Sequence, residues 1–250
     1  LQSALIKAAK EALLKIVSAT EKLDIVIVAG LPVLYGEKLY NCAAVIHQGE
    51  IIGIVPKRNI PNYSEFYEMR YFTPFDGREL RTIDNFADEE SVEFGPAVFE
   101  CADVSFAVEI CEDLWVPKSP SVDYASHGAQ IILNLSCSDE VIGKADFRRN
   151  LVASQSAKLV SAYVYADAGL GESTTDMVFA GHNIIAENGK ILAESKKFEG
   201  GIIYADIDVE RITAERKRMN TFKIKTTGDD YVNAITFDAY FPDIEIKRHI

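Results

Sequence analysis

The sequence predicts a single α/β domain that mixes parallel and antiparallel strands. Short apolar runs recur along the chain, and helical patterns lie between several of them. The dipeptide Asn188-Gly189 stands between two apolar runs, which is a strong signal for a tight antiparallel hairpin. The sequence contains no internal repeat, low-complexity segment or linker, so we expect residues 1–250 to form one domain.

Charge and composition exclude several functional classes. The net charge of −12 disfavours nucleic-acid binding, because phosphates need a basic surface. No apolar run reaches the roughly 20 residues that cross a bilayer, and no signal peptide opens the chain, so we expect no membrane partner. The four cysteines and four histidines show neither disulfide nor metal-ligand spacing. We therefore predict a cytoplasmic, reduced and metal-free protein.

The first elements are a helix and three strands. Residues 1–20 predict a helix, since Leu5, Leu13 and Val17 belong to one apolar face. The chain has no initiator methionine and starts inside this helix, so we expect it to begin within a longer protein. Residues 24–30 ("DIVIVAG") are too continuously apolar for a solvated face and predict a buried strand. Residues 42–55 predict two strands around a turn at 47–50.

A long polar loop follows from residue 56 to residue 80, with six aromatic residues between Tyr63 and Phe75. Loops of this length in a compact domain are usually functional or disordered, and the aromatic content argues against disorder.

The tail after residue 217 is expected to be extended. Further strands are expected at residues 97–101, 104–110, 130–135, 162–166, 178–186 and 201–206, and helices at 121–128, 144–159 and 208–217.

Cys111 is the first candidate for chemistry, because it stands where an apolar strand ends and the chain must turn. Nucleophiles are often carried on such turns, where backbone N–H groups point at the reacting atom. Most lone cysteines are core residues, however, and Glu112 and Asp113 follow this one directly. A carboxylate about 5 Å away opposes the thiolate by roughly 3 kcal/mol at an effective dielectric near 20. A reactive Cys111 therefore needs a cation nearby.

Lys57 is the candidate for that cation. It follows a buried strand and a proline in "GEIIGIVPK", which places it at a strand end. A loop lysine is usually solvated, but a fixed ammonium is what Cys111 would need beside two acids.

The strings around these residues are similar to a known family. Lys57 in "VPKRNIPNYSEFYEMRYF", Cys111 in "VEICEDLW" and the segment "GLGESTTDMVFAGHNIIAENG" resemble the nitrilase (carbon–nitrogen hydrolase) superfamily. More narrowly, "PNYSEFYE", "CEDLW" and "ESTTD" resemble the glutaminase domains of glutamine-dependent NAD synthetases, over essentially the whole chain. The resemblance implies a nitrilase-like α-β-β-α sandwich with mixed sheets, truncated at its N-terminus.

Nitrilase-family enzymes use a Glu–Lys–Cys triad, and the resemblance implies roles for the matching residues. Cys111 would attack the side-chain amide of glutamine, releasing ammonia and leaving a thioester for water to hydrolyse. Lys57 would stabilise the thiolate and, with the backbone N–H of Glu112, the oxyanion. Glu68 matches a second acidic residue of the family and would orient the site.

The general base is missing from this pattern. The family carries it in a Pro-Glu motif upstream of the helix at residues 1–20, and no Pro-Glu dipeptide precedes Lys57. The resemblance implies that a strand, a helix and the glutamate-bearing turn are missing here. Without the base, proton transfer should slow by about 10²–10⁴-fold. We therefore expect the parent protein to be a glutaminase and this segment alone to be weak or inactive.

Glutamine carries an ammonium and a carboxylate, so its pocket needs an acid and hydrogen-bond donors. By resemblance, Glu112 would bind the α-ammonium, while Ser138 and Lys144 would take the carboxylate. Lys144 stands in place of an arginine of the family pattern, which loses bidentate geometry. Tyr63 and Trp115 are candidate pocket walls, although core packing explains Trp115 equally well.

The sequence also bears on cofactors and partners. Neither a P-loop nor a Ser-Gly-Gly-x-Asp-Ser loop is present, so we expect no cofactor in this domain. The resemblance implies a C-terminal synthetase domain beyond Ile250, using ATP and magnesium, that amidates nicotinic acid adenine dinucleotide with the ammonia. It also implies a homo-oligomer.

Two alternatives remain open. A stand-alone amidase or carbamoylase would use the same triad and would end near residue 250, whereas a synthetase would continue well beyond it. A non-catalytic nitrilase-like scaffold is favoured by the missing glutamate and opposed by the intact Lys57 and Cys111.

Overall fold

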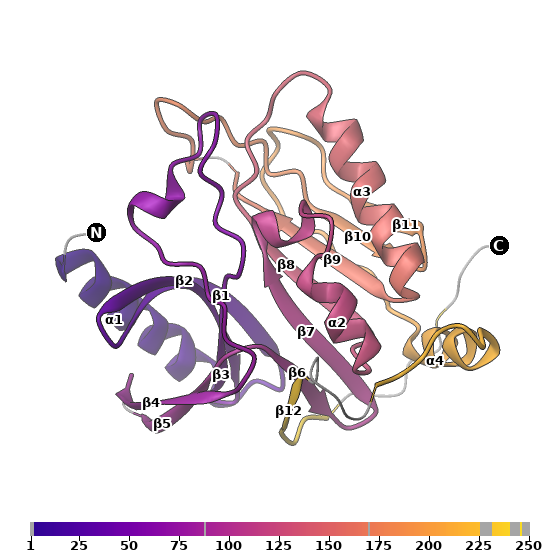
Figure 1. Ribbon diagram of the computed structural model, residues 1–250, viewed down its shortest axis with the longest axis horizontal. Coiled ribbons are helices and arrows are strands. Elements are labelled where there is room, and N and C mark those ends of the chain that lie inside the picture. Colours follow the sequence, from indigo (N-terminus) through magenta and orange to yellow (C-terminus); the bar gives the residue numbers. More distant parts are fainter. Residues whose placement is uncertain (1–2, 88, 170, 226–231, 241–245, 247–250) are drawn as a thin grey trace.

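The computed structural model describes residues 3–87, 89–169, 171–225, 232–240 and 246, which form two packed β-sheets with helices outside them (Figure 1). The strands are β1 (Val26–Tyr35), β2 (Lys38–His47), β3 (Glu50–Pro56), β4 (Arg81–Phe86), β5 (Glu89–Phe94), β6 (Ala97–Cys101), β7 (Val104–Ile110), β8 (Ile131–Ser136), β9 (Ala162–Asp167), β10 (Ile184–Glu187), β11 (Lys190–Glu194) and β12 (Asn233–Thr236). The helices are α1 (Ser3–Thr20), α2 (Pro120–Ser126), α3 (Lys144–Leu159) and α4 (Val209–Arg218), with 3-10 turns at Glu68–Arg70 and Cys111–Leu114.

The two sheets have different strand arrangements. The first has five strands in the order β1-β2-β3-β5-β4, and the second has seven in the order β11-β10-β9-β8-β7-β6-β12. In the second sheet β7, β8 and β9 are parallel neighbours, while β6 and β10 flank them antiparallel. The prediction of mixed sheets is confirmed.

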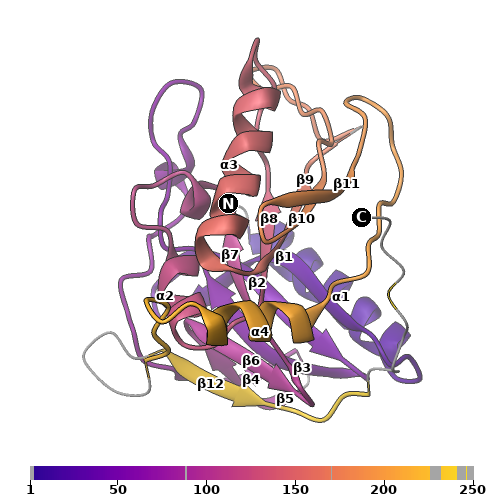
Figure 2. The same ribbon diagram turned by 90° about the vertical axis from the view of Figure 1, so that its right-hand side faces the viewer.

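Alternation along the strands sorts the apolar side chains into three clusters. On β2, Ala44 packs in the cluster that contains Leu13 of α1, whereas its neighbour Val45 packs in the cluster between the sheets. On β7, Val108 joins the cluster between the sheets, and Ala107 joins the one beneath α2 and α3. Helix α1 thus covers the first sheet and helices α2 and α3 cover the second (Figures 1 and 2). This is the predicted α-β-β-α sandwich.

Several predicted elements are confirmed with a visible physical cause. Strands β10 and β11 pair across Asn188 and Gly189, whose φ angles of 45° and 86° are those that a tight hairpin turn requires. Helix α3 has the predicted bounds, and α2 lies within one or two residues of its prediction. Helix α4 begins after Asp208, whose side chain accepts a hydrogen bond of 2.8 Å from the N–H of Arg211.

The first sheet differs from the expectation in three ways. Strand β1 is an edge strand, and Val26 and the next three residues are only partly buried, so the prediction of a buried strand is wrong. Strand β1 also continues to Tyr35 and pairs with β2 through a turn at Gly36, where φ is 59°. The sequence does not predict β4 and β5, because their segments "RTIDNF" and "EESVEF" are largely polar.

Two strands expected in the second half are wrong. Of residues 178–186, only the end belongs to a strand, because Gly181 takes a left-handed φ of 63° that interrupts the extended run. Residues 201–206 have no regular structure, and Ile202 and Tyr204 are 92% and 87% exposed. An alternating apolar pattern predicts a strand, but a segment becomes one only when a neighbouring strand is available for pairing. Part of the tail predicted to be extended, at residues 226–231 and 241–245, lies outside the described residues.

The predicted apolar face of α1 is only partly buried. Its C-terminal half packs on the first sheet through Leu13 and Val17, whereas Leu5 is 51% exposed. No helix in the described part of the chain has both the length and the apolar character needed to cross a bilayer.

Helix α4 is fastened to the second sheet by a buried arginine. The Arg216 guanidinium donates hydrogen bonds to backbone carbonyls of Gly128, Ala129, Leu159 and Val160, at 2.6–3.2 Å. Burial lowers the pKa of this guanidinium to about 10. Gly128 and Ala129 follow α2, and Leu159 and Val160 lie at the C-terminal end of α3, so Arg216 supplies donors to carbonyls near both helix ends.

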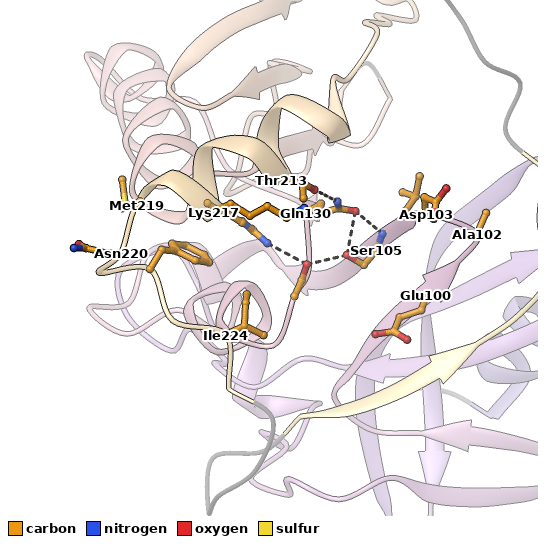
Figure 3. A pocket seen from close by; sticks show the side chains of 14 residues that line it. Glu100, Ala102, Asp103, Ser105, Gln130, Thr213, Lys217, Met219, Asn220 and Ile224 are labelled. Atoms are coloured by element: carbon orange, nitrogen blue, oxygen red, sulfur yellow. Dashed lines mark hydrogen bonds between the residues drawn. The ribbon is translucent and has the colours of Figure 1, made fainter.

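A cavity of about 560 Å³ lies between α4 and the start of β7. Gln130 bridges the two, accepting hydrogen bonds from Ser105 and donating one of 2.8 Å to Thr213 (Figure 3). This cavity is at the N-terminal end of β7, and Cys111 follows the other end of the same strand.

Replacing Arg216 by methionine should lower the free energy of unfolding by about 2–4 kcal/mol, because buried carbonyls lose their donors. Urea denaturation followed by circular dichroism measures this. Arg218→Met on the same helix is the control, since Arg218 is exposed and pairs only at the surface with Glu215. Its effect should stay within about 0.5 kcal/mol. Equal losses in the two variants would contradict the anchoring role of Arg216.

Candidate active site

The ends of several strands meet at a cavity of about 650 Å³. Lys57, Cys111 and Cys137 directly follow β3, β7 and β8, and Asp167 is the last residue of β9. All four side chains line this cavity. Ligand sites of α/β proteins commonly lie at the carboxyl ends of parallel strands. The structure therefore brings the two predicted chemical residues, Cys111 and Lys57, into one cavity.

Two loops complete the wall of the cavity. The aromatic loop after β3 contributes Phe66, Tyr67 and Glu68, and the segment "ESTTD" contributes Glu172. The Tyr67 hydroxyl donates a hydrogen bond of 3.1 Å to Asp176, which joins the two loops. The long loop is thus ordered against the cavity, as the prediction of a functional loop requires.

Cys111 sits on a strained turn that its neighbours hold in place. Its φ is 47°, in the left-handed region that non-glycine residues rarely adopt, and its backbone N–H donates to Asn134 Oδ1 at 3.1 Å. Asp113 accepts hydrogen bonds from the N–H of Ile110 at 3.0 Å and from both the N–H and the side-chain amide of Asn59 at 2.8 Å. The carboxylate of Asp113 therefore holds the turn against the loop after β3.

Lys57 is buried and ion-paired. Its ammonium is 2.5 Å from Glu68 Oε2, and the other Glu68 oxygen accepts a hydrogen bond of 2.6 Å from Asn41. Only 2% of the Lys57 side chain is exposed, and the Glu68 carboxylate compensates the cost of burying this charge. Glu68 thus contacts Lys57, while its predicted role in orienting the site stays a prediction.

The charges around the Cys111 thiol partly cancel. Burial raises the pKa of this thiol, while the Lys57 ammonium and the N–H of Cys137 lower it; Glu68 and Asp167 raise it again. The acids that oppose the thiolate most are therefore not its neighbours in sequence. The expected compensating cation, Lys57, is the strongest charge that favours the thiolate.

Glu112 and Tyr63 lie together outside the lining of the cavity. The Tyr63 hydroxyl donates to both Glu112 oxygens, at 3.0 and 3.1 Å, and burial with this contact raises the pKa of Tyr63 to about 12. Burial raises the pKa of Glu112, whereas Tyr63 and Lys57 lower it. Trp115 stacks on Phe147 with ring centroids 5.6 Å apart. The predicted roles of Glu112, Tyr63 and Trp115 toward a substrate stay predictions.

Ser138 and Lys144 have protein partners. The Lys144 ammonium pairs with Asp139 and lies 5.4 Å from the centre of the Trp115 ring. The backbone N–H of Ser138 donates to Asp167 Oδ1 at 2.8 Å, and its hydroxyl accepts from the fully buried Arg148 at 3.2 Å. Neither residue lines the cavity, so their expected contact with a carboxylate also stays a prediction.

Three polar residues near the cavity are not predicted from the sequence. Asn134 holds the Cys111 backbone, and Asp167 presents a buried oxygen, Oδ2, that has no hydrogen-bond partner among the described residues. Burial raises the pKa of Asp167 to about 6. Cys137 lines the cavity beside Cys111. A polar residue inside or just after an apolar strand is the signal that could have indicated Asn134 and Asp167.

The described residues offer no metal site. Their histidine, cysteine and carboxylate side chains do not gather into a group that could hold a metal ion, and all four cysteines are free. The arrangement instead combines a buried thiol on a strained turn with a fixed ammonium, which suits nucleophilic attack on a carbonyl-like carbon.

Comparisons with known proteins agree with this geometry. The model of the carbon–nitrogen hydrolase family matches residues 1–217. The chain is 44% identical over 228 residues to a glutamine-dependent NAD(+) synthetase of Mycobacterium tuberculosis, covering 89% of this chain and 33% of the relative. The chain therefore spans about a third of the length of the curated relatives that it matches.

Solved structures show the same fold. A glutamine-dependent NAD(+) synthetase from Cytophaga hutchinsonii superimposes with a TM-score of 0.69 at 26% identity, covering 78% of this chain and 31% of that one. A carbon–nitrogen hydrolase from Helicobacter pylori also gives a TM-score of 0.69, at 21% identity, over 86% of this chain and 73% of that one.

Two substitutions should change the reactivity of Cys111 in opposite directions. Lys57→Met removes the ammonium that lowers the thiol pKa, so alkylation of Cys111 by iodoacetamide at pH 8 should slow by about tenfold or more. Glu68→Gln removes a charge that raises this pKa, so alkylation should become faster. The Cys111 peptide is quantified by mass spectrometry over time.

Glu65→Gln is the matched control, because it removes a carboxylate from the same loop that is not among the main charges acting on Cys111. Its alkylation rate should equal that of the unchanged protein. If Lys57→Met and Glu68→Gln shift the rate in the same direction, the electrostatic assignment is wrong.

Proposed function

The chain belongs to the carbon–nitrogen hydrolase family, and from this premise we propose that it hydrolyses the side-chain amide of glutamine. The observation that carries the proposal is the buried Lys57–Glu68 pair beside Cys111, a cysteine held on a left-handed turn. The relatives named glutamine-dependent NAD(+) synthetase favour glutamine as substrate over the substrate of a stand-alone amidase.

In the proposed reaction the Cys111 thiolate attacks the amide carbon of glutamine. Lys57 faces the same cavity, and its ammonium stabilises first the thiolate and then the negative oxygen of the tetrahedral intermediate. The C–N bond breaks, the nitrogen leaves as ammonia after gaining a proton, and a thioester remains on Cys111. Water then hydrolyses the thioester to glutamate and restores the thiol.

Glu68 acts through Lys57 in this scheme. Its carboxylate lies 2.5 Å from the ammonium and is itself held by Asn41, so both are positioned before the substrate arrives. Since Glu68 neutralises Lys57, we assign it a positioning role. We place the general base in a glutamate contributed by a part of the parent protein outside these residues.

The two charged ends of glutamine need opposite partners. Glu112, oriented by Tyr63, is proposed to bind the α-ammonium, and Ser138 with Lys144 the carboxylate. If Lys144 binds the substrate carboxylate, its ammonium must contact both Asp139 and that carboxylate. Asp167 offers a second acid within the cavity, since one of its oxygens has no partner among the described residues.

The parent protein is proposed to use the ammonia in a second domain. That domain would amidate nicotinic acid adenine dinucleotide to NAD with ATP and magnesium, as the names of the relatives suggest. We also propose a cytoplasmic homo-oligomer as the working form of the parent protein.

Cys111→Ala in the full-length parent protein tests the reaction. NAD formation driven by glutamine should fall to background, because no thioester can form. NAD formation driven by ammonium chloride should remain within about twofold of the unchanged protein. Both rates are followed by coupled NAD fluorescence. Glutamine-driven synthesis that survives the substitution would exclude the glutaminase proposal.

Glu112→Gln tests the substrate contact in the same protein. Removing the charge that is proposed to bind the α-ammonium should raise the KM for glutamine by about tenfold or more and leave the rate with ammonia unchanged. Glu93→Gln, on the exposed face of β5, is the control and should leave both parameters unchanged. An unchanged KM in Glu112→Gln would remove Glu112 from the pocket.

A further inference from the structure

The cavity contains a second thiol beside the nucleophile. Strands β7 and β8 are parallel neighbours with Ile110 opposite Leu135, so Cys111 continues one strand and Cys137 lies just beyond the end of the other. Neighbouring strands lie about 4.8 Å apart, and disulfides join Cα atoms about 4.4–6.8 Å apart. Cys137 is one residue beyond the position opposite Cys111, so we expect Cα atoms about 6 Å apart, within the range of a covalent bridge.

Direct interactions support this proximity. The backbone N–H of Cys137 interacts with the Cys111 thiol, and both side chains line the same cavity. After burial, the strongest influence that raises the pKa of Cys137, to about 12, is the charge of Cys111. The two side chains thus line one cavity, each within reach of the other's charge.

The other two cysteines have different surroundings. Cys42 and Cys101 are 0% and 1% exposed and belong to apolar clusters, whereas Cys137 is exposed. A water-borne oxidant or reductant can therefore reach Cys137 but not Cys42 or Cys101 in the folded protein.

We propose that Cys111 and Cys137 form a reversible disulfide when a peroxide oxidises the nucleophile, and that this bridge switches the site off. The Cys111 thiolate attacks the peroxide O–O bond, taking one oxygen to become a sulfenic acid and releasing water or an alcohol after protonation. The Cys137 thiol then loses its proton and attacks the sulfenic sulfur. The S–O bond breaks, the oxygen leaves as water, and two thiols have been oxidised by one peroxide.

The charges determine which sulfur reacts first. Lys57 favours the thiolate of Cys111, whereas the raised pKa of Cys137 keeps it a thiol until the sulfenic acid forms beside it. The second step is intramolecular, so a small thiolate fraction suffices. Once bridged, Cys111 cannot attack a substrate, and it is protected from irreversible oxidation to the sulfinic acid.

The full-length parent protein is treated with hydrogen peroxide, and thiols are trapped and mapped by mass spectrometry. We expect a loss of about 2 Da, a peptide linked between Cys111 and Cys137, and full reversal by dithiothreitol. In Cys137→Ser, Cys111 should instead gain about 32 Da as the sulfinic acid, which dithiothreitol does not reverse. The fraction of Cys111 recovered as thiol should differ by about tenfold or more between the two proteins.

Cys101→Ala is the matched control, since it removes a buried cysteine and should leave the link unchanged. Sulfinic acid at Cys111 without a link, a link to another cysteine, or thiols that stay reduced would each overturn the proposal. The measurement needs no catalytic turnover, so its outcome is independent of whether glutamine is the substrate.

Discussion

A buried ammonium beside a thiol is the constraint on which this site depends. Lys57 is almost completely removed from water, and a lone charge in that position would be costly, so Glu68 must stay within contact distance. Glu68 in turn opposes the thiolate that Lys57 favours. The ion pair therefore activates Cys111 less than a lone lysine would, and in return it holds the ammonium in position.

The fold also fixes the position of Cys111, by holding its backbone in a strained conformation. Cys111 holds a left-handed conformation that costs about 1–3 kcal/mol, and it persists because Asp113 and Asn134 fasten the turn at both ends. Asp113 also accepts two hydrogen bonds from Asn59, just past Lys57. One buried carboxylate thus fixes the distance between the strand end that carries the nucleophile and the one that carries the cation. Asp113, the second of the two acids that follow the cysteine and that are puzzling in the sequence, thus has a structural role.

The parts of this site that the sequence predicts are those with local signals. Cys111 and Lys57 each end an apolar strand, and the strings around them resemble one family, so both were within reach. Asn134, Cys137 and Asp167 depend on which strands are neighbours, and the order β7-β8-β9 is a tertiary property that no local pattern encodes. The same limit explains the fold errors. The polar strands β4 and β5 pair with each other despite weak strand propensity. The apolar segment at residues 201–206, by contrast, does not pair with a strand.

The charge balance of the cavity changes in the same way in the two covalent products proposed for Cys111, the thioester and the disulfide. In a thioester or a disulfide the sulfur is neutral, so the Lys57 ammonium no longer has a thiolate to stabilise and is balanced by Glu68 alone. Asp167 is another charge that opposes the Cys111 thiolate, so its repulsion of the sulfur also ends when the sulfur is neutral. A thioester and a disulfide therefore both remove from the cavity the one charge on which Lys57, Glu68 and Asp167 all act.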